Sequence, residues 1–187
     1  MRRTFSYFVL TIVAALTFAA CGSNFDSSST ASSAKFNDAD VMFTQSMILH
    51  HQQAVEMAKM AQKHASTTEV KQLADEIEAA QGPEITTMTG WLKDWGKKAP
   101  KDSMSGMDHG TMTGMMSDDD MKKLSAATGP AFDKMFLTKM ISHHSGAIEM
   151  AKSEQKDGRN KDAVALAKKI EAAQTTEMAD MKKLLIA

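Results

Sequence analysis

The sequence predicts an all-α protein, an antiparallel four-helix bundle made of two tandem helical hairpins. Three observations lead to this fold class. Ala, Met, Lys, Glu and Gln dominate the chain after residue 37, whereas β-branched residues are sparse and never alternate with polar ones as in a strand. The chain repeats itself at an offset of 93 residues, so that residues 40–92 match residues 133–185. Each copy contains two amphipathic stretches around a short polar break, which predicts one hairpin per copy.

The predicted helices, in chain order, span residues 38–64, 67–95, 129–156 and 160–186. Residues 64–67 (HAST) and 157–160 (DGRN) are polar and provide the turn within each hairpin. Gly82-Pro83 in the second helix has no counterpart in the fourth, where Thr175-Thr176 stand, so we expect a kink in the second helix alone.

Two adjacent histidines lie in the first helix of each copy, within MILHHQQAVEM (residues 47–57) and MISHHSGAIEM (residues 140–150). On a helical wheel the apolar stripe runs between the two histidines, so both flank the face that is turned towards the core. In the partner helix of each copy, one Gln and one Glu fall inside the apolar stripe. An isolated buried carboxylate is costly, and the His pairs are the nearest partners by symmetry. The pseudo-twofold core expected from the duplication contains His50, His51, Gln81, Glu84 and Asp40 from one copy and His143, His144, Gln174, Glu177 and Asp133 from the other.

These side chains have two interpretations. The histidines and carboxylates could satisfy one another and fix the register of the helices, a known role of buried polar groups. Alternatively, the imidazoles bind a metal together with neighbouring methionines and carboxylates, which four inward histidines in one bundle favour. The candidate metal ligands of the bundle are His50, His51, His143, His144, Met47, Met140, Glu84 and Glu177.

The linker between the two copies, residues 97–117, is polar and Gly-punctuated but rich in methionine. Its candidate metal ligands are Met104, Met107, His109, Met112, Met115 and Met116. A loop has no core to fill, so packing does not explain these methionines. Thioethers select Cu(I), and Ag(I) by the same argument, with imidazole as a compatible ligand. An adaptable protein-binding surface is the alternative.

Composition supports a soft metal. The 187-residue chain has 17 Met but a single Cys, Cys21. In an oxidising compartment Met supplies a soft ligand without the tendency of thiols to form disulfides, which fits copper better than iron or zinc. The net charge of −1 gives no basic excess for nucleic acid.

The N-terminus resembles a bacterial lipoprotein signal. Arg2 and Arg3 precede an apolar run that ends in Ala19-Ala20-Cys21, which is similar to a lipobox except for Phe18 in place of the usual Leu. The resemblance implies a lipid on Cys21; a secreted protein with an unmodified Cys is the alternative. Anchoring would place the protein on the outer face of the cell membrane or in the periplasm.

The predicted domain organisation follows from this signal and from the duplication. It consists of a signal peptide (1–20), a lipidated Cys with a flexible Ser-rich tether (21–37), and the bundle (38–187), divided into repeat one (38–96), the Met/His-rich loop (97–117) and repeat two (118–187).

The stretches FTQSMILHHQQAVEMA and FDKMFLTKMISHHSGAIEMA, with the lead-in GMMSDDDMKKLSAATGPAFDKMF, resemble the domain of unknown function 305 family, ferritin-like four-helix proteins often exported by bacteria. The resemblance covers about residues 38–187. It implies a helical bundle, and some members are associated with copper binding and tolerance in the periplasm. No general activity is established for this family.

The leading hypothesis is a lipid-anchored extracytoplasmic protein that captures or buffers Cu(I) for copper tolerance, with the loop as an accessible site and the His-His face as a second one. A ferritin-like oxidase of Cu(I) or Fe(II) is the alternative, but di-iron bundles use Glu-x-x-His, which the chain lacks, and we assign no catalytic residue. A third possibility is a structural or partner-binding bundle without metal; the sequence identifies no protein partner.

Overall fold

The computed structural model describes residues 35–100 and 112–186. Its helices are α1 (Asp38–His64), α2 (Thr68–Asp94), α3 (Asp118–Ala126), α4 (Gly129–Asp157) and α5 (Lys161–Leu184). The predicted all-α bundle is confirmed, with α1 and α2 as one hairpin and α4 and α5 as the other. The short helix α3 was not predicted. The predicted signal peptide, Cys21, most of the tether, Met104, Met107 and His109 lie outside the described residues.

Local signals set the ends of the helices. Asn37 and Asp40 form a capping box at the start of α1, in which the Asn37 side chain accepts from the Asp40 N–H at 3.0 Å and the Asn37 N–H donates to the Asp40 carboxylate at 2.6 Å. Thr67 caps α2 and Asn160 caps α5 with their side-chain oxygens. The second helix runs without interruption through Pro83. None of the helices in the described part of the chain is apolar over enough residues to cross a bilayer.

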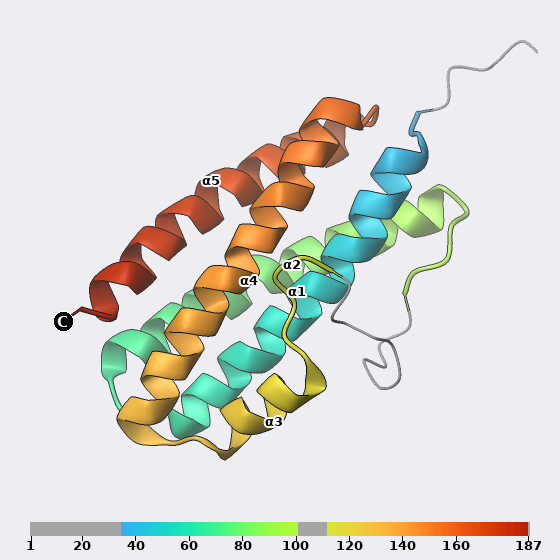
Figure 1. The fold of residues 1–187 in the computed structure, drawn as a ribbon. Coiled ribbons are helices and arrows are strands. Elements are labelled where there is room, and N and C mark those ends of the chain that lie inside the picture. Colours follow the sequence, from blue (N-terminus) through green and yellow to red (C-terminus); the bar gives the residue numbers. More distant parts are fainter. Residues whose placement is uncertain (1–34, 101–111, 187) are drawn as a thin grey trace, which may run out of the picture. The chain divides into compact units, whose positions relative to one another are not determined.

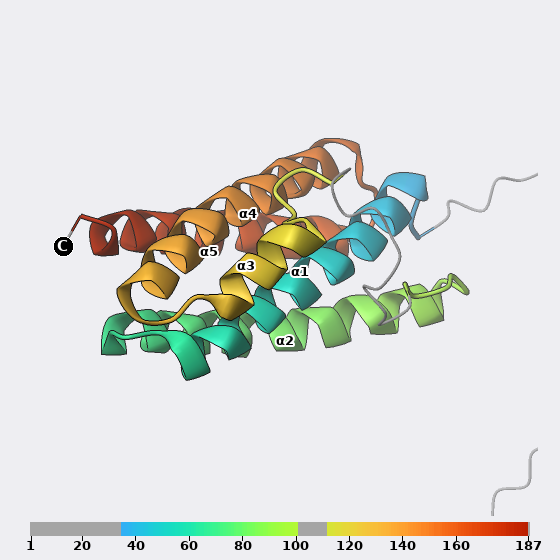
Figure 2. The ribbon, with the colours of Figure 1, turned by 60° about the horizontal axis from the view of Figure 1, so that its bottom comes forward.

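The two hairpins meet through their first helices. Figure 1 shows α1 and α4 side by side, and α2 and α5 contact each other only sparsely. Figure 2 shows α3 lying across α1 and α4 on one face. Two apolar clusters fill the core. One contains Phe132 and Phe136 of α4 with Leu124 of α3, and the other contains Met47 of α1 with Ile170 of α5.

A buried aspartate from each hairpin caps the turn of the other hairpin. The Asp133 carboxylate accepts from the backbone N–H groups of Ser66 and Thr67 at 3.0 and 3.2 Å. At the equivalent positions, Asp40 accepts from the N–H groups of Arg159 and Asn160 at 3.0 and 2.8 Å. The start of α4 therefore lies beside the end of α1, and the start of α1 lies beside the end of α4. The helices α1 and α4 are antiparallel.

The expectation that Asp40 and Asp133 join the histidine cluster is therefore wrong. Asp40 is ten residues before His50 on one continuous helix, which separates them by about 15 Å at 1.5 Å per residue. Both aspartates are buried, as predicted, but open backbone N–H groups at a hairpin turn satisfy their charge.

Candidate metal centre

Four histidines lie in the middle of the interface between α1 and α4. His50 and His51 are at the centre of α1, and His143 and His144 are at the centre of α4. All four side chains are fully buried. The rings of His50 and His143 are in contact, with centroids 3.6 Å apart and an interplanar angle of 38°. Because the two residues are equivalent in the duplication, the pseudo-twofold axis passes between them.

The outer histidine of each pair meets a carboxylate from the second helix of its own hairpin. His51 Nε2 lies 2.7 Å from Glu84 Oε2, and His144 Nε2 lies 2.6 Å from Glu177 Oε2. The carboxylate side chains are 24% and 19% exposed, so each pair links the core to the surface. A neutral imidazole that donates from Nε2 carries its lone pair on Nδ1. Metal-binding histidines are commonly held by a carboxylate in this way.

The inner histidines are neutral at physiological pH. Burial, followed by the charges of His51 and His144, lowers the pKa of His50 to about 3. The Thr113 backbone opposes this shift, although it does not reach hydrogen-bond geometry. Burial also lowers the pKa of His143 well below its usual value, and the neighbouring His50, His144 and His51 act in the same direction.

Most of the ring nitrogens have no partner. Within residues 35–100 and 112–186, both nitrogens of His50 and His143 and Nδ1 of His51 and His144 are buried without a hydrogen bond. A buried polar atom without a partner costs about 1–3 kcal/mol, and native structures hold few of them. Each neutral imidazole carries one lone pair, so these six nitrogens on four adjacent side chains mark the region as a candidate site for a ligand that accepts up to four lone pairs.

Thioethers are the other donors on the same helices. Met47 and Met140 are fully buried and lie three residues before the inner histidines, on the same helix face. Among the residues that the structure describes, no three side chains of His, Cys, Asp or Glu converge on one point. Imidazole and thioether side chains together are a donor set that suits Cu(I).

The end of the Met-rich loop crosses the α1 and α4 interface beside the inner histidines. We call residues 112–117 the strap. Gln53 fixes it on α1: the amide Nε2 donates to the Met116 carbonyl at 2.9 Å, and the Met116 N–H donates to Gln53 Oε1 at 2.7 Å. Met116 is 3% exposed, whereas Met112 and Met115 are partly exposed. The strap thus leaves two thioethers accessible near the buried histidines.

Two glycines permit the strap to lie against α4. Gly114 has a φ of 84°, and a Cβ there would lie 2.8 Å from the Ser142 carbonyl oxygen. A Cβ on Gly146 would lie 1.9 Å from the Thr113 carbonyl oxygen. Gly146 is the repeat equivalent of Gln53, so the two equivalent positions carry different residues where the strap crosses. Gln53 binds the strap by hydrogen bonds, and Gly146 has no side chain that would collide with it.

The sequence contains a signal for the strap that helical periodicity does not reveal. The two copies read HHQQ and HHSG, a departure from an otherwise close match directly after the histidines. Glu154, a buried carboxyl of α4 with Ala61 as its equivalent, was not predicted. Burial raises its pKa to about 8, with further contributions from Asp40 and Asp157.

Comparison with known proteins gives one family and several solved structures. The model of the domain of unknown function family DUF305 matches residues 40–185. A DUF305 protein of Streptomyces coelicolor, named as a candidate secreted protein, is 32% identical with a TM-score of 0.71, over 79% of this chain and 92% of that one. A DUF305 fragment from Deinococcus radiodurans is 30% identical with a TM-score of 0.72, over 80% and 96% of the two chains.

A further group of similar structures is that of CopM. The Cu(I)-bound form is 31% identical with a TM-score of 0.64, over 78% of this chain and 94% of that one. Similar structures of CopM exist with Cu(II) and with Ag. No functionally curated protein matches the chain.

Proposed function

The chain belongs to the DUF305 family, and from this premise we propose that it captures or buffers Cu(I), and by the same chemistry Ag(I), outside the cytoplasm. The observation that carries the proposal is the set of buried imidazole nitrogens without partners between α1 and α4, under a strap that carries methionines. The similarity to CopM, solved with Cu(I), Cu(II) and Ag, points to the same metals.

The proposed ligands divide into two groups. In the bundle, the imidazoles of His50, His51, His143 and His144 and the thioethers of Met47 and Met140 would hold the ion. Glu84 and Glu177, which the sequence offers as ligands, are better placed to orient His51 and His144, because their carboxylates already meet the Nε2 atoms of these two imidazoles. Cu(I) prefers such soft or borderline donors, and neither a thioether nor a neutral imidazole must lose a proton to bind it.

The second group is the loop. Met112, Met115 and Met116 belong to the strap, and we propose Met104, Met107 and His109 as further ligands. An ion bound first by these methionines would be held next to the buried histidines, because the clamp between Gln53 and Met116 fixes the end of the loop there.

Localisation is part of the proposal. The signal at residues 1–20 would export the protein, and a lipid on Cys21 would anchor it to a membrane surface through the Ser-rich tether. A capture protein in that position would meet copper before it reaches the cytoplasm.

A di-iron oxidase is the less favoured alternative. Such sites need several carboxylates and histidines around two ions, and in the described part of the chain no three of these groups are arranged to hold one ion.

The experiment that tests the proposal is an anaerobic Cu(I) titration against a chromogenic chelator with the mature chain. One variant replaces both His50 and His143 by Leu, and the matched control replaces the half-exposed His64 by Leu. We expect weaker Cu(I) binding in the double variant only, together with higher stability of its metal-free form, because buried nitrogens without partners are removed. Failure of the intact chain to compete would refute the proposal, and unchanged affinity in the double variant would refute the histidine site.

A third variant separates the two groups of ligands. Met104, Met107, Met112 and Met115 are changed together to Leu, which keeps the apolar volume and removes the sulfur. We expect fewer bound ions with the bundle histidines intact. Loss of all binding would place the whole capacity in the loop and make the histidines structural.

A further inference from the structure

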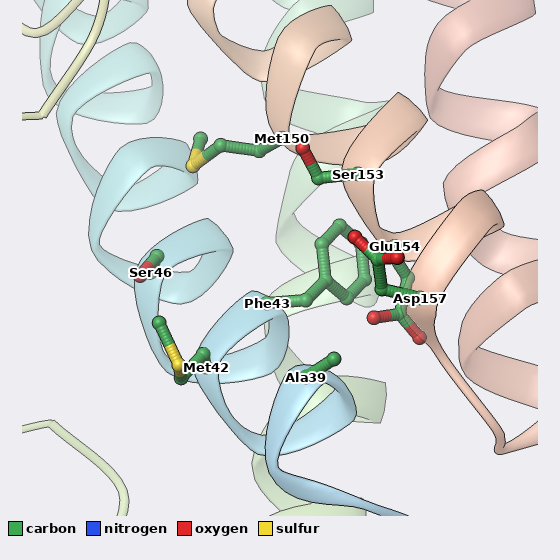
Figure 3. A pocket seen from close by; sticks show the side chains of 8 residues that line it. All are labelled: Ala39, Met42, Phe43, Ser46, Met150, Ser153, Glu154 and Asp157. Atoms are coloured by element: carbon green, nitrogen blue, oxygen red, sulfur yellow. The ribbon is translucent and has the colours of Figure 1, made fainter.

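An open groove lies between the N-terminal half of α1 and the C-terminal half of α4. Figure 3 shows Met42 and Ser46 projecting from α1 and Met150 from α4, with Glu154 beside the Phe43 ring. The groove has a volume of about 360 Å³. Met42 is 68% exposed, one of two large apolar side chains so exposed in the described residues. The groove is separate from the histidine cluster and takes no part in the proposed copper site.

The duplication provides an internal template for what fills such a groove. The equivalent surface, at the other ends of α1 and α4, is covered by α3. Met121 and Leu124 of α3 pack into the apolar cluster that contains Phe136, the equivalent of Phe43. Lys139, the equivalent of Ser46, bonds to Asp120 of α3 at 2.7 Å. A short amphipathic helix with two large apolar side chains three residues apart therefore fits this surface.

The open groove has no such cover from its own repeat. By the offset of the duplication, residues 25–33 correspond to α3, and Ser28 and Ala31 stand where α3 has Met121 and Leu124. Neither carries an apolar side chain large enough to replace them. The matching segment of this chain thus lacks the two apolar groups that hold α3.

The acidic groups of the groove indicate what an occupant carries. Glu154 is 1% exposed, and neither of its carboxyl oxygens has a hydrogen-bond partner among the described residues. Its equivalent is Ala61, and the nearby exposed Asp157 replaces His64, so both acidic groups are particular to the open groove. Burial raises the pKa of Glu154 to about 8, and the neighbouring Asp40 and Asp157 act in the same direction. A Lys or Arg side chain would satisfy both carboxyls.

We propose that this groove binds a short basic amphipathic helix of a partner protein, with two large apolar side chains three residues apart packed on Met42, Phe43 and Met150, and a Lys or Arg that meets Glu154 and Asp157. Helix-in-groove recognition of this kind uses the apolar side chains for affinity and the charge for selection.

The test uses the metal-free mature chain, so that its outcome does not depend on copper. Two fluorescent helical peptides share an apolar pair at i and i+3 and differ only in Lys or Glu at the remaining positions. We expect the basic peptide to bind and the acidic peptide to bind at least tenfold more weakly. The Met42→Lys and Asp157→Asn variants should each weaken the basic peptide several-fold, whereas Ile186→Lys, at an exposed residue outside the groove, should not.

The site of binding is read by NMR of methionines labelled at the methyl group. The signals of Met42 and Met150 should shift with the basic peptide, and that of Met135, the equivalent of Met42 beside α3, should not. Equal affinity for both peptides, no binding, or shifts that spare Met42 would overturn the proposal. Concentration-dependent self-association that Met42→Lys abolishes would overturn it in favour of a second copy as the occupant.

Discussion

Replacement of Gly146 by Ala tests whether the strap is a structural part of the bundle. In the interior of a helix, Gly to Ala is normally stabilising, by about 1 kcal/mol. The matched control is Gly90→Ala in α2, where an added Cβ meets nothing within 4 Å. The two changes have the same effect on helix propensity and differ in what the new methyl group contacts.

The structure sets the size of the difference. The new Cβ at Gly146 would lie 1.9 Å from the Thr113 carbonyl oxygen, so the strap must move by more than about 1 Å to reach van der Waals contact. That movement breaks the two bonds between Gln53 and Met116, at about 1 kcal/mol each. It also exposes part of the Met116 side chain, worth about 1.5–3 kcal/mol when fully buried. After the gain in propensity, we expect a net loss of about 2–3 kcal/mol.

The assay is urea unfolding followed by circular dichroism, with the free energy of unfolding extrapolated to water. Gly90→Ala should be as stable as the natural chain or up to about 1 kcal/mol more stable. A double-mutant cycle adds Gln53→Ala, which releases the same strap from the other side, so the losses should overlap instead of adding. If Gly146→Ala is as stable as Gly90→Ala, the strap does not contribute to the folded state and the reasoning fails.

Further predictions concern the two buried acids and the inner histidines. Asp133→Ala should destabilise the bundle by about 2–4 kcal/mol, because it leaves the N–H groups of Ser66 and Thr67 without an acceptor, and hydrogen exchange should accelerate first at that turn. The pKa of Glu154 is raised from 4.5 to about 8, so between these pH values the folded chain holds a proton that the unfolded chain has lost. The free energy of unfolding should therefore fall as pH rises through that window, by at most about 1.4 kcal/mol per pH unit. Glu154→Gln should remove this part of the pH dependence, measured as the difference in urea midpoint between the two chains at pH 5, 7 and 9; parallel curves would contradict it. In metal-free chain, the Leu variant of His50 and His143 should melt at a higher temperature than the natural chain, and a lower one would show that the two rings stabilise each other.

Most of the fold could be predicted because the same pattern of helices and turns occurs in both copies of the duplicated sequence. The helix ends were placed to within a few residues by the turns at residues 64–67 and 157–160, where polar residues interrupt both copies of one pattern. The helix α3 was missed because its nine residues DDDMKKLSA are mostly charged, and only Leu124 is fully buried. Its stability comes from packing against α1 and α4, which periodicity within so short a segment cannot indicate.

The candidate site could be predicted in part. The wheel identified the core-facing histidines and their carboxylate partners, because both follow from helical periodicity. It could not separate the outer histidines, which meet Glu84 and Glu177, from the inner ones, whose rings contact each other, because that depends on how α1 and α4 cross. For the same reason, Gly146 could not be related to Thr113: a contact between segments 33 residues apart has no periodic signature.

The aspartate of each hairpin binds the turn of the other hairpin, so the two hairpins associate with twofold pseudosymmetry within one polypeptide. Asp40 serves the turn at Arg159 and Asn160, and Asp133 serves the turn at Ser66 and Thr67, so each half holds what the other needs. This reciprocity is that of a homodimer, in which one surface is complementary to itself. Covalent linkage leaves the two halves free to differ: one has Gln53, the other has Gly146, and the end of the segment that joins them is the strap. A symmetric pair cannot hold a single chain segment across its axis without losing its symmetry, and here that loss lies beside the histidines.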